Sequence, residues 1–220
     1  MTATRQIKVL SLSDVIVSFI YSPQVRRRFS DVDLVIGCGD LAYYYLEYVL
    51  TALDKPLFFV RGNHDKIVEY SLEAQRTAPS GAVDLHRKVI SHNGLLFAGV
   101  EGSLRYRPGR FQYSQGEMWG HVFALVPPMM VNRMRHGRFL DILVTHAPPS
   151  GIHDMEDLPH RGINAIRWLI QVFKPNYHFH GHVHVYRPDT VVDTHLGSTH
   201  IINTFSYRET ILQDCQQSLK

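Results

Sequence analysis

The chain has 220 residues, of which 45% are hydrophobic and 20% are charged, and its formal net charge is +3. This composition is typical of a globular protein with a substantial core, and so small a charge does not by itself indicate a nucleic-acid binder. No apolar run approaches the roughly 20 residues of a membrane-spanning helix, and the first residues lack a secretory signal pattern. We therefore expect one domain over residues 1–220 and no membrane segment.

The two cysteines, Cys38 and Cys215, have no repeating spacing. They exclude a disulfide-rich scaffold and a four-cysteine zinc site. We therefore expect a reducing intracellular compartment, the cytoplasm. Cys38 is expected to be a small buried residue rather than a metal-binding thiolate.

In the first part of the chain, short apolar runs alternate with a helical stretch. We expect strands at 7–13, 33–36 and 57–60 and a helix at 41–53. Such alternation favours an α/β domain. Polar residues follow each strand, at the end where open α/β sheets place their ligands. These residues are Asp14, Asp40, Asn63, His64 and Asp65.

The middle of the chain is less regular. An Asn-Gly pair within 89–100 indicates a tight hairpin. Residues 101–116 are rich in Arg, Tyr, Gly and Pro, and long connections of this kind are usually functional or mobile. A helix is expected at 117–136, interrupted at Pro127 and Pro128 because proline removes a backbone donor.

The last part of the chain returns to regular patterns. We expect strands at 139–144, 177–180 and 201–205, the first of them followed closely by His146. Residues 162–174 carry apolar side chains at helical spacing and predict an amphipathic helix. These elements continue the α/β alternation.

The motif Gly181-His182-Val183-His184 follows the expected strand at 177–180. Residues two apart in an extended chain share one face, so His182 and His184 could aim two imidazoles the same way. Taken alone, the motif fits a polar loop equally well. Imidazoles grouped with the carboxylates and amide of the other strand ends would suit Mn, Fe or Zn, and a pair of such metals could activate water for attack at phosphorus.

The ordered motifs resemble those of the calcineurin-like metallophosphoesterase superfamily. They are Asp14, Gly39-Asp40, Gly62-Asn63-His64-Asp65, Thr145-His146 and Gly181-His182-Val183-His184. The resemblance implies a four-layer α/β/β/α sandwich with mixed sheets. It also implies a metal-dependent phosphohydrolase that uses one or two divalent transition metals (Mn, Fe or Zn) on a phosphomonoester or phosphodiester.

The resemblance further implies a role for each matched residue. Asp40 would bridge the two metals. The other ligands would be Asn63, His146 and His182 for one metal, and Asp14 and His184 for the second. His64 would lie by the scissile phosphate, as proton donor to the leaving oxygen or as oxyanion stabiliser. Asp65 would orient His64 through a hydrogen bond.

The chain departs from the family at its first motif, where the family has Asp-x-His and this chain has Ile16. Isoleucine cannot bind a metal, so the second metal site is weakened unless water, His153 or His160 replaces the ligand. The departure favours an alternative function, a binding or scaffold protein that kept the fold. A nuclease-like use of the arginines in 101–110 is a weaker alternative that no nucleic-acid motif supports.

Four arginines have two possible roles at this stage. They are Arg61, Arg105, Arg107 and Arg110. Each is either surface charge or a group that binds substrate phosphate, since the guanidinium fork suits bidentate phosphate contact.

Overall fold

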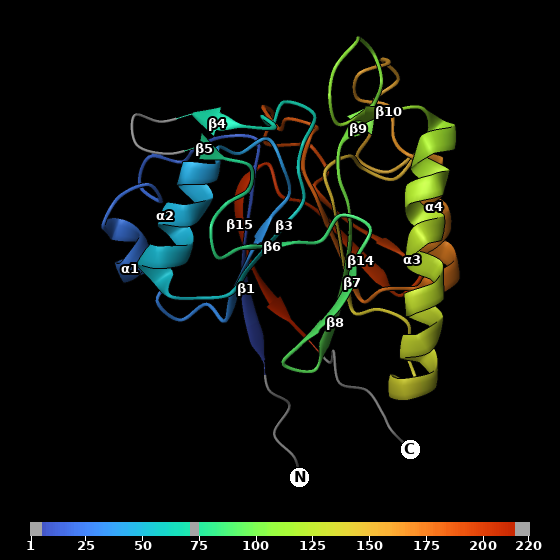
Figure 1. Cartoon of the computed structure of the whole chain (residues 1–220), viewed down its shortest axis with the longest axis horizontal. Helices are drawn as coiled ribbons and strands as arrows, with labels where there is room; N and C mark the ends of the chain where they lie inside the picture. Colours follow the sequence, from blue (N-terminus) through green and yellow to red (C-terminus); the bar gives the residue numbers. More distant parts are fainter. Residues whose placement is uncertain (1–5, 71–74, 214–220) are drawn as a thin grey trace.

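A computed structural model of the chain describes residues 6–70 and 75–213. Two β-sheets face each other, and a pair of helices covers the outer side of each sheet (Figure 1). The expectations about Cys215 and about the first five residues fall outside the described ranges. Among the described residues, none of the helices combines the length and apolar character that crossing a bilayer requires.

The first sheet has the strand order β15-β1-β2-β3-β6. Its strands are β1 (Ile7–Ser13), β2 (Leu34–Gly37), β3 (Leu57–Phe59), β6 (Val83–Asp84) and β15 (Ser206–Leu212). The first four are parallel to one another, and β15 pairs antiparallel with β1 at the edge. The carboxyl ends of the parallel strands therefore lie along one edge of the sheet.

The second sheet has the order β13-β14-β12-β11-β8-β7. Its strands are β7 (Val89–His92), β8 (Leu95–Val100), β11 (Ile142–Thr145), β12 (Tyr177–His180), β13 (Asp193–Leu196) and β14 (Thr199–Asn203). The four central strands are parallel, and β7 and β13 run antiparallel at the edges. Both sheets are thus mixed, as predicted.

Three apolar clusters separate the four layers. The inner cluster lies between the sheets, where the rings of Phe58 and Phe97 stack with centroids 4.3 Å apart. The second joins the first sheet to α1 (Gln24–Arg28) and α2 (Tyr43–Leu53), and the third joins the second sheet to α3 (Gln115–His136) and α4 (Asn164–Phe173). The α/β/β/α arrangement is confirmed.

The predicted interruption of α3 at Pro127 and Pro128 is wrong, because the helix continues through both residues. Pro127 lies on the exposed side, where water can bind the carbonyl group left without an N–H partner. Leu125 and Met129, on the other side, are buried against the sheet. Tertiary packing therefore outweighs the local cost of the prolines.

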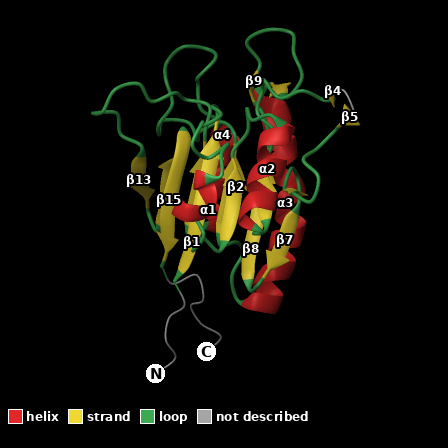
Figure 2. Ribbon diagram, turned by 90° about the vertical axis from the view of Figure 1, so that its left-hand side faces the viewer, coloured by secondary structure: helices red, strands yellow, loops and turns green. Residues whose placement is uncertain are grey.

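Most loops gather at one end of the two sheets, opposite the chain termini (Figure 2). The connection 101–116 is less irregular than expected, because β9 (Ser103–Leu104) and β10 (Gln112–Tyr113) form a short parallel pair within it. A second small pair of strands, β4 (Glu69–Tyr70) and β5 (Gln75–Arg76), lies at the same end of the molecule, above the first sheet (Figure 1). This loop end holds the candidate site.

Candidate metal centre

Three candidate ligands have left-handed backbone conformations. The φ angles are 67° at Asp14, 56° at Asp40 and 69° at His182. Non-glycine residues adopt such angles at a cost, and they persist where the surrounding structure holds them. A neighbour is constrained too: a Cβ atom on Gly62 would lie 2.0 Å from Oδ1 of Asp40, so a glycine is required there. The strand ends are thus shaped to bring these side chains together.

His146 lies at the centre of the cluster and is fully buried. Its Nδ1 is 2.8 Å from the carbonyl oxygen of Cys38. Because a carbonyl oxygen accepts hydrogen bonds and does not donate them, Nδ1 carries the hydrogen of the neutral ring. Nε2 therefore presents a lone pair, and it faces Oδ1 of Asn63 at 2.9 Å and Oδ2 of Asp40 at 3.5 Å.

His182 is held in the same manner. Its Nε2 donates to the carbonyl oxygen of Pro159 at 2.7 Å, which leaves the lone pair on Nδ1. That Nδ1 lies 3.1 Å from Nε2 of His146. Asn63 completes the group, because its amide nitrogen donates to the hydroxyl of Tyr106 at 3.3 Å and its oxygen is thereby turned inward.

Four acceptor atoms therefore converge, from Asp40, Asn63, His146 and His182. Such a group is repulsive unless a cation, or a proton on Nε2 of His146, lies between its members, and carboxylate, amide and imidazole donors suit a divalent transition metal. Outer hydrogen bonds that fix imidazole tautomers are typical of metal ligands. The residues present therefore fit a metal ion.

The ionisation of the cluster follows the same electrostatics. Burial alone would lower the pKa of His146, but the carboxylates of Asp40 and Asp14 outweigh it and raise the pKa. Burial opposes ionisation of Asp40, yet His146 and the backbone N–H of His64 hold its pKa below the usual range. A positive charge is thus favoured at this place.

His64 lies at the rim of the cluster and is exposed. Its backbone N–H donates to Oδ1 of Asp40 at 2.7 Å. Its ring lies 3.5 Å from the hydroxyl of Tyr106 and 3.5 Å from Nη2 of Arg107. Tyr106 was missed by the sequence reasoning, although the Tyr- and Arg-rich composition of 101–116 was a signal for this region.

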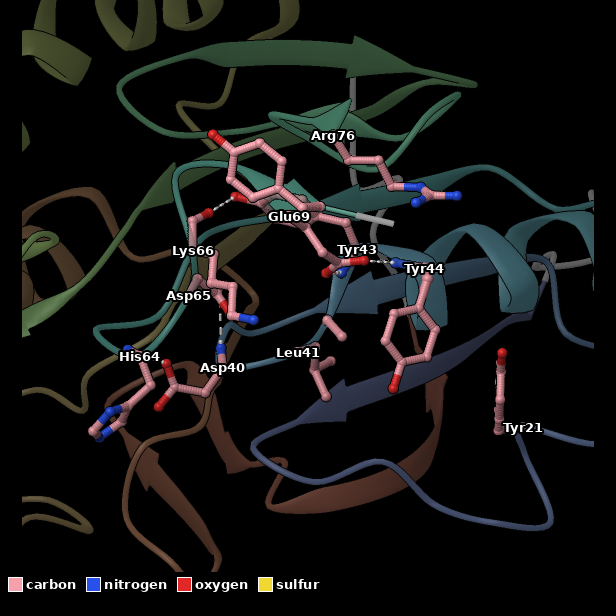
Figure 3. A pocket seen from close by; sticks show the side chains of 12 residues that line it. Tyr21, Asp40, Leu41, Tyr43, Tyr44, His64, Asp65, Lys66, Glu69 and Arg76 are labelled. Carbon is pink, nitrogen blue, oxygen red and sulfur yellow. Dashed lines mark hydrogen bonds between the residues drawn. The ribbon is translucent and has the colours of Figure 1, made fainter. Parts of the chain in front are cut away.

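The expected hydrogen bond from Asp65 to His64 is not the contact that the structure shows. Oδ2 of Asp65 instead accepts from the backbone N–H group of Gly62 at 2.7 Å and from that of Asp40 at 3.2 Å, the second of which is drawn in Figure 3. The physical reason is burial, because the carboxylate turns inward to satisfy two buried donors. Burial and the charge of Asp40 raise the pKa of Asp65 to about 7.

The four arginines separate into different roles. Arg61 forms an ion pair with Asp84 and lies 3.6 Å from Glu101, so it is part of the structural framework. Arg105 pairs with Glu117 at 3.0 Å. Arg110 is exposed. Arg107 is the member of this set whose guanidinium lies beside His64.

The family model of calcineurin-like phosphoesterases matches residues 7–186 of the chain. The chain belongs to the calcineurin-like phosphoesterase family. The chain matches none of the curated proteins with which it was compared.

Solved structures support the metallophosphoesterase fold. TT1561 of Thermus thermophilus is similar with a TM-score of 0.61 and 14% identity, over 92% of this chain and 90% of that one. GAP50, the anchor in the inner membrane complex of Plasmodium, is similar with a TM-score of 0.52 and 13% identity, over 90% of this chain and 71% of that one. At identities this low, the likeness shows a shared fold and nothing more.

The residues expected at a second metal position are less closely gathered than the cluster around His146. Both carboxylate oxygens of Asp14 accept from the backbone N–H of His182, at 3.1 Å each. Nε2 of His184 lies 3.7 Å from Oδ1 of Asp14, and its ring is partly exposed. Ile16 is 43% exposed and offers no ligand. Among the described side chains, Asp14 and His184 do not join the tight group formed by Asp40, His146 and His182.

The two histidines considered as replacements have other partners. His153 lies between His180 and Thr194, with nitrogen contacts of 2.9 Å to each. His160 contacts the carboxylate of Asp157 at 2.7 Å, and its ring lies 5.4 Å from that of His182. In this structure each of the two side chains is thus held by partners other than Asp14 and His184.

Proposed function

We propose that the protein is a metal-dependent phosphohydrolase that binds one or two Mn, Fe or Zn ions and hydrolyses a phosphate ester. The observation that carries the proposal is the convergence of four acceptor atoms around Nε2 of His146. A divalent metal bound there supplies positive charge that stabilises the reacting phosphate and lowers the pKa of water to about 7.

Each nearby residue then has a definite task. Asp40, Asn63, His146 and His182 would hold the first metal, and Asp14 and His184 would contribute with Asp40 to a second. The ring of His64, exposed beside Tyr106, is placed to give a proton to the leaving oxygen or to stabilise negative charge on phosphate oxygens.

Arg107 adds a second positive group at the rim. Its guanidinium lies beside His64 and can form charge-assisted hydrogen bonds with a phosphate. Asp65 acts more indirectly, because its carboxylate fixes the backbone of Gly62 and Asp40. We therefore treat Asp65 as a positioning residue for Asp40.

A specific observation favours a second candidate function. GAP50, whose fold is similar, is described as an anchor, and Ile16 removes a ligand from this chain. A protein that kept the fold only to dock other proteins would bind no metal firmly and would hydrolyse neither a phosphomonoester nor a phosphodiester.

The test combines metal analysis with hydrolysis of p-nitrophenyl phosphate and bis(p-nitrophenyl) phosphate in the presence of Mn, Zn, Fe or Mg. We expect one firmly bound metal and activity toward one of the esters. His182→Ala should remove the metal and the activity, whereas His136→Ala, at the far end of α3, should change neither. Full metal content and activity in His182→Ala would refute the assignment.

A further inference from the structure

A pocket of about 520 Å³ opens directly beside His64 and Asp40. Its walls carry four tyrosines, which we call the tyrosine pocket: Tyr21, Tyr43, Tyr44 and Tyr70. His64 and Asp40 lie on one side of it, and Tyr44 and Tyr21 lie on the other (Figure 3). The volume is within the range of about 300–1,000 Å³ that is usual for small-molecule sites.

Three of these tyrosines are available to a ligand. Tyr21 is 44% exposed, Tyr44 is 39% exposed and Tyr70 is 70% exposed. Tyr43 is buried, and its hydroxyl donates to the carbonyl oxygen of Lys66. Exposed aromatic side chains that gather around one pocket indicate a binding surface.

The aromatic wall is held in place by its neighbours. The rings of Tyr21 and Tyr44 meet edge to face with centroids 5.6 Å apart, and Tyr21 also contacts Tyr48 with centroids 4.8 Å apart. The backbone of α2 begins here, and its first N–H groups are fixed by Glu69, which accepts from Tyr44 at 3.1 Å. A wall that is already ordered loses little side-chain entropy when a ligand binds.

The charged side chains around the pocket indicate which class of ligand it can bind. The carboxylate of Glu69 is occupied by backbone donors, and the carboxylate of Glu47 pairs with Arg76 at 2.8 Å. Lys66 is exposed and adds a positive charge at the side of the pocket that carries His64. The carboxylates of Asp40 and Asp65 also line the pocket, but they accept from backbone N–H groups, and Asp40 faces the proposed metal. The pocket is therefore suited to a flat aromatic group attached to an anion.

We propose that the tyrosine pocket binds a planar aromatic group on the alcohol part of the phosphate ester, as in a nucleotide. This inference rests on the proposed function, since the phosphate is taken to lie at the metal centre. His64 and Asp40 also line the pocket. When the phosphate of an ester lies beside these two residues, its alcohol part can therefore extend into the pocket. Its base can then stack on the exposed tyrosines, which tolerate any base because every base has an aromatic face.

The experiment compares adenosine 5′-monophosphate with ribose 5-phosphate, which share the phosphate ester bond and differ in the base. Binding is measured by calorimetry on metal-free and metal-loaded protein, and KM is measured wherever hydrolysis occurs. Stacking on aromatic side chains predicts that the nucleotide binds about 5- to 150-fold more tightly. Tyr44→Ala should remove most of this preference and leave the affinity for ribose 5-phosphate unchanged.

Two further variants serve as controls. Tyr44→Phe keeps the ring and should keep the preference. Phe123→Ala removes an exposed aromatic side chain on α3, away from the pocket, and should have no effect. Circular dichroism checks that each variant is folded.

The outcomes separate this inference from the proposed function. Equal binding and equal KM for the two esters would overturn the tyrosine pocket, even if both are hydrolysed. A nucleotide preference that disappears in Tyr44→Ala, in a protein that hydrolyses neither these esters nor the two p-nitrophenyl esters, would overturn the proposed function and support the pocket. A preference that survives in Tyr44→Ala and in Tyr21→Ala would place the base elsewhere and refute the inference.

Discussion

His86, which is not one of the candidate metal ligands, is predicted to make the protein sensitive to acid. Its Nδ1 accepts the backbone N–H of Glu101 at 3.2 Å, so a proton on Nδ1 would meet another donor. Its ring lies 4.8 Å from that of His121. Burial first, and then the charge of His121, outweigh the opposing charge of Asp84 and lower the pKa of His86 to about 3. The carboxylate of Glu101 lies 3.5 Å from Nε2 of His86 and favours protonation.

The effect on stability follows from the direction of this shift. The unfolded chain takes up a proton near the usual histidine pKa of about 6.5, whereas folded His86 remains neutral until about 3. The stabilisation is therefore complete above pH 6.5 and is lost as the pH falls. Each pH unit in this interval costs about 1.4 kcal/mol, so His86 alone should cost about 2 kcal/mol at pH 5.

The variant His86→Gln provides the test, because the glutamine oxygen can accept the same N–H and does not titrate. Urea unfolding is followed at pH 7.5, 6.0 and 5.0 in the presence of a chelator, so that metal release is common to all samples. Between pH 7.5 and 5.0 the free energy of unfolding should shift by about 2 kcal/mol in favour of the variant.

The exposed end of α3 offers a matched control, His136→Gln, which also removes one histidine. The free energy of unfolding of this variant should change with pH by the same amount as that of the wild type. If the His86→Gln curve is parallel as well, the buried ring is protonated in the folded state and the reasoning fails.

Three further predictions concern the metal centre. His64→Ala should lower kcat by about 10²–10⁴-fold on an ester with a poor leaving group and by less on an activated aryl ester, and an equal loss on both would argue against proton donation. Arg107→Ala should raise KM at unchanged metal content, whereas Arg105→Ala should leave KM unchanged, because Arg105 pairs with Glu117; equal effects would remove Arg107 from phosphate binding. Ile16→His should tighten the weaker metal in equilibrium dialysis, and two equally tight metals in the wild type would contradict this expectation.

The layers of the fold could be predicted because they depend on local patterns. Apolar runs marked the strands, and α4 occupies most of the predicted amphipathic helix. The closeness of Asp40, Asn63 and His146 could be expected because each follows a parallel strand, the first two in one sheet and His146 in the other. Their expected roles as metal ligands came from the resemblance to the family. The continuity of α3 could not be predicted from the sequence. The cost of Pro127 is visible in the local sequence, but the packing of α3 against the sheet, which offsets this cost, involves residues distant in the chain.

Other parts of the site depend on the path of the loops. Tyr106 reaches His64 because β9 pairs with β10, and no periodicity in 101–116 reveals that pairing. Tyr21 and Tyr44 look like ordinary loop and helix residues, and only the fold brings the loop before α1 and the start of α2 to one pocket. Whether Asp65 contacts His64 or the buried backbone N–H groups also depends on burial, which cannot be read from the sequence motif.

Backbone strain gives an independent reason to favour a working metal centre over a scaffold. Positive φ angles at Asp54 and Lys174 have a structural cause, because these residues end helices. Those at Asp40 and His182 lie just after strands, and both side chains belong to the cluster. Residues in such conformations cost on the order of 1–3 kcal/mol each and persist when the surrounding structure fixes them. Docking through an outer surface would not require that cost, whereas holding acceptor atoms around a cation does.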